Sequence, residues 1–428
     1  MPLAMPKSRE EIASIQRERR VVALERAKRA PFHKERLAHI DPARANVPEV
    51  WASIPILTKD ELRAIPANRF LNDFCIAPRS DVAELWRSGG ATGTPLFYPR
   101  TFEDLRYGRL SFARTFLAAG ASSGDTAHVS FPLGIHPVGH VYARAAQDTG
   151  IGVNWAGSGA STPSALQIQL IDHLKPTIWL GMSSYGIHLA NLAEADGIDL
   201  ALGSVGLVMC TAEPLSRAKR DKITRMWGAR VHDSFGMTEA GMMGAESEAG
   251  DGFHIWTDMY DIEVVDLDTG MPVPEGTPGG LVVTPLWTNN ATPFVRWSSG
   301  DVVVYREHGA TEGPLSVFPV IRHAHRTVGF FKIRGVNINH QEYEDFLFRF
   351  PEAVDFKAEL VTRDDRELFV VSVEIARGAD ADAVAGRIAE QTRNTFEVTP
   401  DVVVLERGTL AREFESSVKA PRFVDRRT

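Results

Sequence analysis

Between residues 126 and 235, short hydrophobic runs alternate with amphipathic segments of helical period. The runs are rich in β-branched and aromatic residues and lie at 126–131, 151–155, 177–180, 204–210 and 229–232. Apolar residues recur at helical spacing in the intervening segments 164–174 and 216–227. This alternation predicts an α/β fold with a largely parallel sheet and helices on its faces, in which ligands bind at the carboxyl ends of the strands.

Two charged segments near the start of the chain carry helix-capping signals. An amphipathic pattern over residues 8–30 begins at Ser8, with Glu11 three residues later. Thr58 and Glu61 repeat this arrangement. A hydroxyl residue followed three positions later by Glu is typical of a capping box, so a helix is predicted to begin at each site.

After Gly250 the pattern changes to short apolar runs separated by turns. Runs at 260–266, 280–284 and 301–305 predict an antiparallel or barrel-like subdomain. A small α+β unit is predicted next, with strand-like runs at 330–333, 358–362, 367–375 and 401–405 and helical patterns at 340–350 and 381–395. The polar, basic tail 416–428 is expected to stay unstructured until something orders it.

Composition and charge narrow the class of protein. The 428 residues carry 47 basic and 55 acidic side chains, a net charge of −8, which disfavours nucleic acid and anionic membranes as partners. The two cysteines, Cys75 and Cys210, support no disulfide framework and suit a reducing cytoplasm. No apolar run approaches the ~18 residues of a membrane span. A homodimer is the default expectation for the assembly.

A glycine- and threonine-rich loop, Ser88-Gly-Gly-Ala-Thr-Gly-Thr-Pro95, follows the strand-like residues 83–86. Glycines let backbone N–H groups close in around an anion, as in a phosphate-binding loop. The loop is not a Walker A sequence, because neither Gly89 nor Gly90 has a Gly at the fifth following position and then a Lys. A flexible connection is the alternative interpretation.

A second segment, Asp233-Ser-Phe-Gly-Met-Thr-Glu239, follows the run at 229–232. It places an aromatic ring, a hydroxyl and a carboxylate at a strand end, where they could stack on a base, bind a phosphate oxygen and hold Mg²⁺. The alternative is a turn with Gly236 at positive φ and Phe235 in the core.

Three further segments carry charge. In Phe294-Val-Arg-Trp-Ser-Ser-Gly-Asp301, the carboxylate after a glycine turn could accept both hydroxyls of a ribose, although a solvated turn is the alternative. Taken alone, the segments 325–344 and 417–427 would be interpreted as a basic strand and a basic tail.

In this order and at these separations, the five segments resemble the adenylate-forming superfamily, and specifically the phenylacetate–CoA ligase family. Connecting motifs extend the resemblance over roughly residues 30–428, among them Leu57-Thr-Lys-Asp-Glu-Leu62, Met182-Ser-Ser-Tyr185 and Cys210-Thr-Ala-Glu-Pro-Leu215. The resemblance implies that a carboxylate attacks the α-phosphate of Mg·ATP, releasing pyrophosphate, and that a thiol then displaces AMP from the acyl-adenylate. ATP, Mg²⁺ and coenzyme A are the implied cofactors.

The family positions imply roles for the motifs. The β- and γ-phosphates would lie in the loop of Ser88, Gly89, Gly90, Thr92, Gly93 and Thr94. Adenine would lie between Ala212-Glu213-Pro214 and Phe235, in the segment of Asp233, Ser234, Phe235, Gly236 and Met237. Thr238 would contact the α-phosphate and Glu239 would bind Mg²⁺. Asp301 would take the ribose hydroxyls, with Arg326 nearby.

The resemblance also implies a mobile C-terminal domain. Lys419 matches the tail lysine of the family, whose ammonium bridges the attacking carboxylate and the α-phosphate during adenylation. A hinge near 327–329 would divide a large N-terminal domain of several subdomains, 1–326, from a small α+β domain, 327–428. Rotation of the small domain would then bring the Arg334-Gly335 loop to the thiol side.

The chain departs from the family pattern at three places. Gly89, Ala91 and Thr94 replace Ser, Thr and Lys in the phosphate loop, which predicts weaker ATP binding with activity retained. No acid follows Arg326 at the hinge, where His325-Arg-Thr-Val-Gly329 replaces Gly-Arg-x-Asp-Asp. A carrier-protein thiol or another nucleophile is therefore an alternative acceptor to CoA. Ser247 stands where family members often have a Cys, although His254 persists, and no zinc is expected.

The acyl pocket would be lined from the segments 131–140, 184–185 and 235–243. Its apolar candidates suit a flat ring, and two histidines could hydrogen-bond a ring substituent: Phe131, Ile135, Tyr185, Met237 and Met243, with His136 and His140. An aryl or arylacetic acid is thus the predicted substrate class, although each residue taken alone is more often plain core. A degenerate nucleotide- or acyl-binding protein is the alternative from another class, against which the retention of Glu239 and Lys419 argues.

Overall fold

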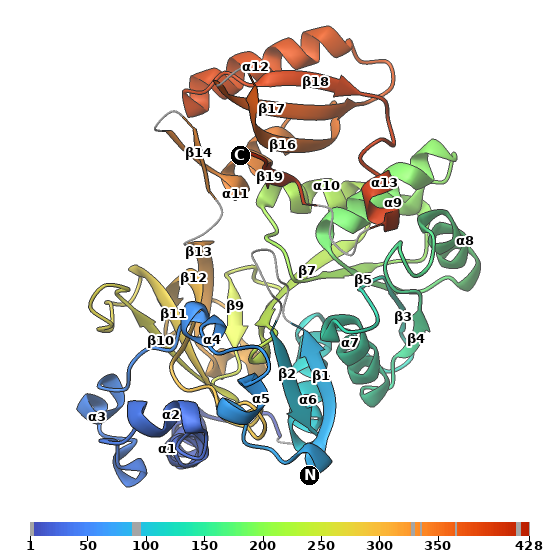
Figure 1. Ribbon diagram of the computed structural model, residues 1–428. Coiled ribbons are helices and arrows are strands. Elements are labelled where there is room, and N and C mark those ends of the chain that lie inside the picture. Colours follow the sequence, from blue (N-terminus) through green and yellow to red (C-terminus); the bar gives the residue numbers. More distant parts are fainter. Residues whose placement is uncertain are drawn as a thin grey trace. The chain divides into compact units, whose positions relative to one another are not determined.

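The structure is a computed structural model that describes residues 4–87, 96–326, 330–333, 336–363, 366–416 and 421–427. The chain forms two compact units (Figure 1). Unit 1 comprises Met1–Thr126, Leu133–Val153 and His232–Thr327, and unit 2 comprises Ala127–Pro132, Asn154–Val231 and Val328–Thr428. The predicted α/β class is confirmed. The division into a fixed and a mobile domain at residues 326 and 327 stays a prediction.

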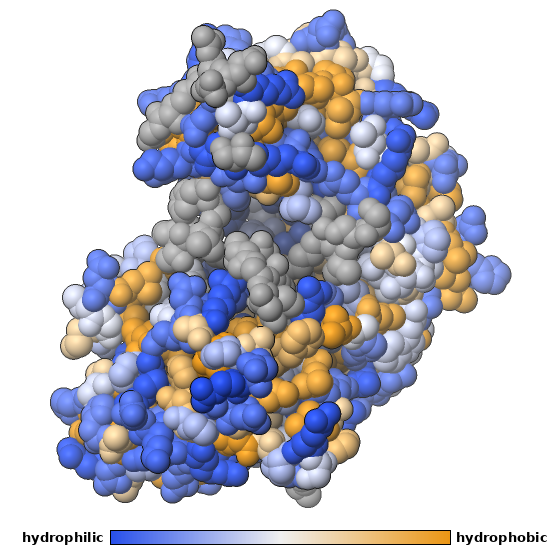
Figure 2. All heavy atoms as spheres, in the orientation of Figure 1, coloured by the Kyte–Doolittle hydropathy of each residue, from blue (hydrophilic) through white to orange (hydrophobic). Residues whose placement is uncertain are grey.

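The described part of unit 1 begins with one long helix and four short ones, whose surface is mainly polar (Figure 2). They are α1 (Arg9–Ala27), α2 (Pro31–Arg36), α3 (Pro48–Ala52), α4 (Lys59–Arg63) and α5 (Phe70–Asp73). The capping box predicted before α4 is confirmed, because Thr58 and Glu61 each accept a bond from the other's backbone N–H. At α1 only half of the predicted box forms. Ser8 accepts from the Glu11 N–H, but the Glu11 carboxylate accepts from the N–H of Lys7.

The strands of unit 1 are antiparallel. β1 (Val82–Arg87) pairs with β2 (Phe97–Thr101), and α6 (Phe102–Ala118) follows and packs beside α7 (Pro137–Asp148). The remaining strands are neighbours in the order β10, β11, β12, β13, β9, β8, β7. Their bounds are β7 (Arg230–Met237), β8 (Gly241–Glu246), β9 (Phe253–Ile255), β10 (Tyr260–Val265), β11 (Pro278–Pro285), β12 (Trp297–Arg306) and β13 (Val320–Arg326). The antiparallel subdomain predicted after Gly250 is therefore confirmed.

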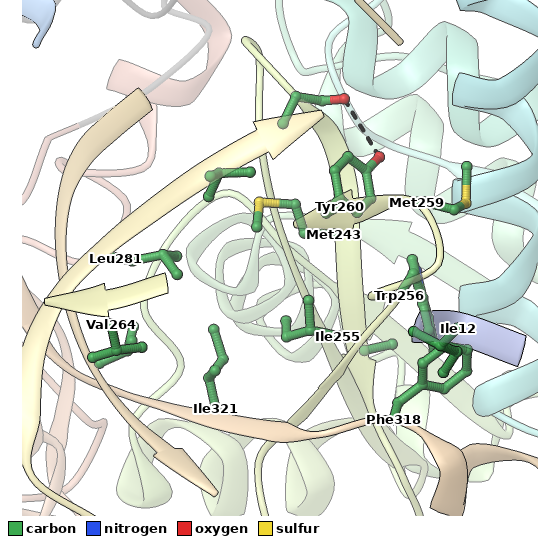
Figure 3. Packing of buried hydrophobic residues seen from close by; sticks show 14 of the residues in the cluster. Ile12, Met243, Ile255, Trp256, Met259, Tyr260, Val264, Leu281, Phe318 and Ile321 are labelled. Carbon is green, nitrogen blue, oxygen red and sulfur yellow. Dashed lines mark hydrogen bonds between the residues drawn. The ribbon is translucent and has the colours of Figure 1, made fainter. Parts of the chain in front are cut away.

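A hydrophobic core fixes this part of unit 1 (Figure 3). It collects side chains from α1 and from β8 to β13: Ile12, Met243, Ile255, Trp256, Met259, Tyr260, Val264, Leu281, Phe318 and Ile321. The Tyr260 hydroxyl donates to the carbonyl oxygen of Ala240 (3.4 Å). Since each buried apolar Å² contributes about 25 cal/mol, this core holds β8 firmly and with it the turn that joins β7 to β8.

Unit 2 contains a sheet with parallel strands and covering helices. The strand order is β6, β5, β3, β4, and the β3–β5 and β5–β6 pairs are parallel. The bounds are β3 (Thr126–Val129), β4 (Gly152–Trp155), β5 (Ile178–Gly181) and β6 (Leu207–Cys210), with α8 (Ser164–Leu174), α9 (Ser183–Ala195) and α10 (Arg217–Trp227) between and after them. The alternation predicted from the sequence is thus confirmed.

The C-terminal part of unit 2 has the predicted α+β pattern. It contains β14 (Phe330–Ile333), β15 (Val336–Asn339), α11 (His340–Phe348), β16 (Ala353–Arg363), β17 (Arg366–Ile375), α12 (Ala381–Phe396), β18 (Asp401–Leu405), α13 (Arg412–Ser416) and β19 (Phe423–Asp425). Four strands form one sheet in the order β18, β17, β16, β19. Among the described residues, no helix combines the length and the apolar character that crossing a membrane requires.

The prediction of an unstructured tail is wrong for residues 421–427. β19 pairs in parallel with β16, placing Phe423 opposite Ala358. Arg422 is 7% exposed and donates to both carboxylate oxygens of Asp355, at 2.9 and 2.6 Å. A basic composition suggested solvation, but these charges are matched by acids far away in the sequence, which a local pattern does not reveal.

Three buried histidines should make the protein acid-sensitive. Burial lowers the pKa of His33, His128 and His188 to about 4. An unfolded histidine titrates near 6.5, so between these values the unfolded chain binds more protons than the folded one, and stability falls as the pH falls from about 6.5 to about 4. Within this range we expect each histidine to lower the free energy of unfolding by roughly 1.4 kcal/mol for each unit by which the pH falls. Urea unfolding at pH 7 and at pH 5 measures this change.

His33→Phe tests this titration, because it removes one of the three groups. The ring of His33 lies 5.1 Å from that of Phe32 and 5.6 Å from that of Phe74, so a phenyl ring suits the site. The slope of the free energy of unfolding against pH should become smaller by the equivalent of about one proton. His39→Phe, at an exposed position, is the matched control. An unchanged slope in His33→Phe would contradict the prediction.

Candidate active site

Several predicted site residues lie outside the described residues. They are Ser88, Gly89, Gly90, Thr92, Gly93, Thr94, Arg334, Gly335 and Lys419, together with the hinge residues 327–329. The structure describes what flanks the phosphate loop: Arg87, the last residue of β1, pairs with Phe97, the first residue of β2. The predicted loop therefore connects two strand ends that are fixed against each other.

The second predicted motif lies mostly on a strand. β7 runs through Ser234, Phe235, Gly236 and Met237, so Thr238 and Glu239 alone begin the turn to β8. The pairing of β7 with β8 shifts register between Phe235 and Gly236. A Cβ on Gly236 would lie 2.5 Å from the carbonyl oxygen of Gly241, so the glycine is required for close approach. The alternative prediction of a positive φ at Gly236 is wrong. In this turn the positive φ occurs at Gly241 (108°).

Two side chains of β2, Tyr98 and Arg100, hold the turn between β7 and β8. Arg100 Nη2 donates to the carbonyl oxygens of Thr238 (2.6 Å) and Glu239 (2.7 Å), and Nη1 donates to the loop 288–292. The Tyr98 hydroxyl donates to Glu239 Oε1 (3.1 Å). Burial lowers the pKa of Arg100, whereas burial and the Glu239 carboxylate raise the pKa of Tyr98. Because residues i and i+2 share one face of a strand, β2 orients both the backbone and the carboxylate of Glu239.

Asp301, Phe235 and a histidine lie together in unit 1. Asp301 is 3% exposed on β12, and its Oδ1 lies 3.0 Å from Nε2 of His323 on β13. The ring of His323 lies 6.4 Å from that of Phe235, and the Phe235 ring lies 5.6 Å from that of Phe253. At the end of β13 the backbone of Arg326 pairs with Asp301. The two predicted nucleoside-binding residues are therefore connected through His323.

Asp233 and Ser234, the other predicted polar residues of β7, bond within unit 1. The hydroxyls of Ser234 and Tyr142 lie 2.6 Å apart, and Asp233 Oδ1 accepts from the Ser234 N–H (2.9 Å). The N–H of Asp233 donates to Glu246 Oε2 (3.0 Å). These bonds fix the strand that carries Phe235, so Asp233 and Ser234 contribute at least a structural role.

The predicted ring-binding residues of unit 1 differ in exposure. Met243 is fully buried in the core of Figure 3, whereas Ile135 is 47% exposed. His136 precedes α7 as its N-cap residue, and Nε2 of His140 accepts from the N–H of Gly134 (2.6 Å). This bond fixes the loop before α7. That these side chains bind a substrate stays a prediction.

In unit 2 the predicted adenine-binding residue Glu213 caps a helix. Its carboxylate accepts from the hydroxyls of Ser183 (2.6 Å) and Ser184 (2.9 Å) and from the N–H of Ser184, at the first turn of α9. Burial would raise the pKa of Glu213, but Lys219 and these donors outweigh it and lower the pKa. Glu213 is thus held by its own unit, whereas its neighbours Ala212 (φ 73°) and Pro214 are exposed.

Lys219 joins Glu213 to the C-terminal part of unit 2. Its Nζ lies 3.5 Å from Glu213 Oε1 and 3.1 Å from Oε1 of Glu344, on α11. Burial favours the uncharged lysine, yet the two carboxylates outweigh it and raise the pKa of Lys219. Nearby, Lys222 donates to the carbonyl oxygens of Ala353 (2.8 Å) and Val354 (2.7 Å). Residues 154–231 and 328–428 are therefore linked through buried charges.

Tyr185 and Phe131 are both buried in unit 2. The Tyr185 hydroxyl lies 2.9 Å from Ser164 Oγ, and its ring lies 5.7 Å from that of Phe414 on α13. Phe414 also stacks on His188, with 5.0 Å between the ring centroids. Their part in an acyl pocket remains a prediction, while the structure shows that Tyr185 contacts the C-terminal helix α13.

Sequence reasoning missed Tyr98, Arg100 and His323. Tyr98 and Arg100 follow the glycine-rich loop two positions apart, as residues on one face of a strand do. The charge of Arg100 within a short strand was the only feature of the sequence that could have indicated them. His323 had a still weaker signal, because it lies two residues before His325, where the predicted basic strand begins.

Comparison with known proteins defines the class. Residues 8–286 match the family of AMP-binding enzymes, so the chain is an adenylate-forming enzyme. Phenylacetate–CoA ligase of Thermus thermophilus is 30% identical, with 94% of each chain covered, and that of Aromatoleum evansii is 29% identical over 88% of this chain and 85% of the relative. A crystal structure of 2-hydroxyisobutyryl-CoA ligase with an acyl-adenylate has the same fold (TM-score 0.84, 23% identity, 99% of this chain and 90% of that one). The chain therefore belongs to the phenylacetate–CoA ligase family of AMP-binding enzymes.

Proposed function

We propose that this protein is an ATP-dependent ligase that converts an aromatic carboxylic acid into its acyl-adenylate and then into its CoA thioester. Family membership supports the reaction class, and the named ligases act on phenylacetate. Within the structure, the arrangement of Glu239 carries the proposal. The buried carboxylate of Glu239, in the β7–β8 turn, accepts a hydrogen bond from Tyr98, and Arg100 holds the main-chain carbonyl of the same residue. It lies in the same unit as the Asp301–His323–Phe235 group.

The chemistry explains why charges must be positioned. In the first step a carboxylate oxygen attacks the α-phosphorus of ATP, and the bond to pyrophosphate breaks. In the second step the CoA sulfur attacks the acyl carbon, the C–O bond to AMP breaks, and the thiol proton is lost. Both reactants of the first step are anions, so cations and N–H donors must offset their repulsion. We assign that task to Lys419 and the phosphate loop, contact with the α-phosphate to Thr238, and the ribose to Asp301.

The described residues fit a magnesium ion that arrives with the nucleotide. Among them, no group of three or more His, Cys, Asp or Glu side chains is placed to hold a metal. Mg²⁺ usually takes one or two carboxylates together with substrate phosphates and water, and the oxygen ligands of Glu239 suit that arrangement. When bound, the ion would neutralise phosphate charge. Glu239 would hold it, with the carboxylate oriented by the Tyr98 hydroxyl.

A panel of acids tests the proposed activity. The enzyme should release pyrophosphate from ATP at least tenfold faster with aromatic acids than with small aliphatic acids of equal charge. The reason is that a flat apolar ring gains binding energy in an apolar pocket. The measurement is acid-dependent pyrophosphate release with CoA, and with a phosphopantetheinylated carrier protein in a parallel reaction. A thioester formed with the carrier alone would favour the carrier-dependent alternative. No acid-dependent exchange of pyrophosphate into ATP across the panel would favour a non-catalytic binding protein.

The proposed reaction also suggests where the protein acts. We place the protein in the cytoplasm, where ATP and CoA are supplied and where the thiols of Cys75 and Cys210 would stay reduced. Burial raises the pKa of Cys75 to about 12, which makes that thiol unreactive. The homodimer stays an expectation from the general preference for two-fold assemblies.

A further inference from the structure

We infer that His323 positions the carboxylate of Asp301 for the ribose of ATP, so that Asp301, His323 and Phe235 act as one nucleoside-binding corner. The inference rests on the proposed function, since it takes unit 1 to bind ATP. It adds a positioning residue that neither the motifs nor the resemblance supplied.

The sheet of unit 1 brings the corner together. β12, β13 and β9 are neighbours, and β8 lies between β9 and β7. Between β12 and β13 the register shifts, because Val302 pairs with His325 whereas Val303 pairs with His323. The extra residue in β13 forms a bulge, a feature that changes the direction of nearby side chains. The bulge lies next to the pair, and His323 on β13 reaches the Asp301 carboxylate on β12.

The chemistry of the His323–Asp301 pair determines which atom carries the hydrogen of their hydrogen bond. An ionised carboxylate only accepts hydrogen bonds, so Nε2 of His323 carries the hydrogen and donates it to Asp301 Oδ1 across 3.0 Å. Asp301 is 3% exposed, and a buried carboxylate is costly unless donors satisfy it. The terminal torsion of an aspartate is otherwise broad. His323 therefore restrains the orientation that Asp301 presents to a ligand.

The aromatic side of the corner fits a base next to the ribose. The ring centroids of Phe235 and Phe253 lie 5.6 Å apart, and the ring of His323, which bonds to Asp301, lies 6.4 Å from that of Phe235. A purine face and two ribose hydroxyls are what an aromatic group beside a carboxylate recognises. Since the ribose takes no part in bond breaking, His323 should affect nucleotide binding and leave the chemical step nearly unchanged.

Three variants test the inference. His323→Leu should weaken binding of AMP and of Mg·ATP about tenfold and raise the KM for ATP to match, with kcat within about twofold, because one hydrogen bond to a charged group is lost. His323→Gln, whose amide N–H replaces Nε2–H, should restore most of the affinity. His308→Leu is the matched control, since His308 is exposed and bonds to Arg9. Calorimetry measures binding without turnover, and pyrophosphate release gives KM and kcat.

A double-mutant cycle with Asp301→Asn tests whether His323 acts through Asp301. If it does, the double variant binds AMP no more weakly than Asp301→Asn alone; additive losses would overturn the inference. Equal affinity of His323→Leu and wild type, or failure of His323→Gln to restore binding, would also overturn it. Should His323→Leu not fold, His323→Phe removes the N–H while keeping a ring. Wild-type protein that binds no adenine nucleotide would overturn the proposed function itself, which separates the two failures.

Discussion

Lys419→Ala should slow formation of the acyl-adenylate by roughly 10²–10³-fold, the usual cost of removing one group that stabilises developing charge. Transfer from a supplied acyl-adenylate to CoA should stay within about threefold of wild type, because the assigned ammonium acts only while carboxylate and α-phosphate are brought together. Acid-dependent exchange of pyrophosphate into ATP measures the first half-reaction. Single-turnover thioester formation from a synthetic adenylate measures the second.

The control for this variant lies in the same tail. Arg426 is exposed and bonds to Glu359 across the β19–β16 pair, so Arg426→Gln removes one positive charge without touching the assigned chemistry. It should retain near wild-type rates in both half-reactions. Equal losses in both half-reactions of Lys419→Ala would contradict the assigned role and point to a general effect on the fold.

Arg100→Met should cost both stability and adenylation. The substitution leaves the carbonyl oxygens of Thr238, Glu239 and Thr288 without the donor that now satisfies them. An unsatisfied buried polar group costs about 1–3 kcal/mol, so the free energy of unfolding should fall by roughly 3 kcal/mol or more. The turn that carries Glu239 should also shift, lowering the adenylation rate at least tenfold. Urea unfolding and pyrophosphate exchange measure the two effects.

Arg106→Met is the matched control for Arg100→Met. Arg106 lies on α6, is 43% exposed and forms a long ion pair with Glu103 (3.6 Å). An exposed pair of this kind contributes about 1 kcal/mol at most, so stability and activity should change little. Tyr98→Phe separates the two supports of the turn, because it removes only the hydrogen bond to Glu239. If Arg100→Met were as stable and active as Arg106→Met, the role given to β2 would be wrong.

The sequence predicted the elements that depend on local pattern. The helix Ala381–Phe396 and the strand Arg366–Ile375 follow their own periodicity, and the Thr58–Glu61 box depends on residues three positions apart. Pairing between distant segments was not predictable in the same way. β19 pairs with a strand more than 60 residues earlier, so its polar composition resembled that of a free tail.

The same distinction holds for the site. Residues placed by family motifs, such as Glu239 and Asp301, could be named from the sequence, because their neighbours along the chain identify them. Arg100 acts on residues 138 and 139 positions away, and His323 meets Asp301 only across two paired strands. Both contacts depend on the pairing of strands, so no spacing within either segment could have indicated them.

The buried lysines of α10 limit how this protein can be divided. Lys219 bonds to Glu344, and Lys222 bonds to the carbonyl oxygens of Ala353 and Val354. A chimera that took its residues 328–428 from a relative would still offer main-chain carbonyls to Lys222, but Lys219 would face whatever side chain the relative has in place of Glu344. Exchange of the C-terminal segment between ligases should therefore keep this ion pair only when the donor has an acid in place of Glu344 or when α10 is transplanted with the segment.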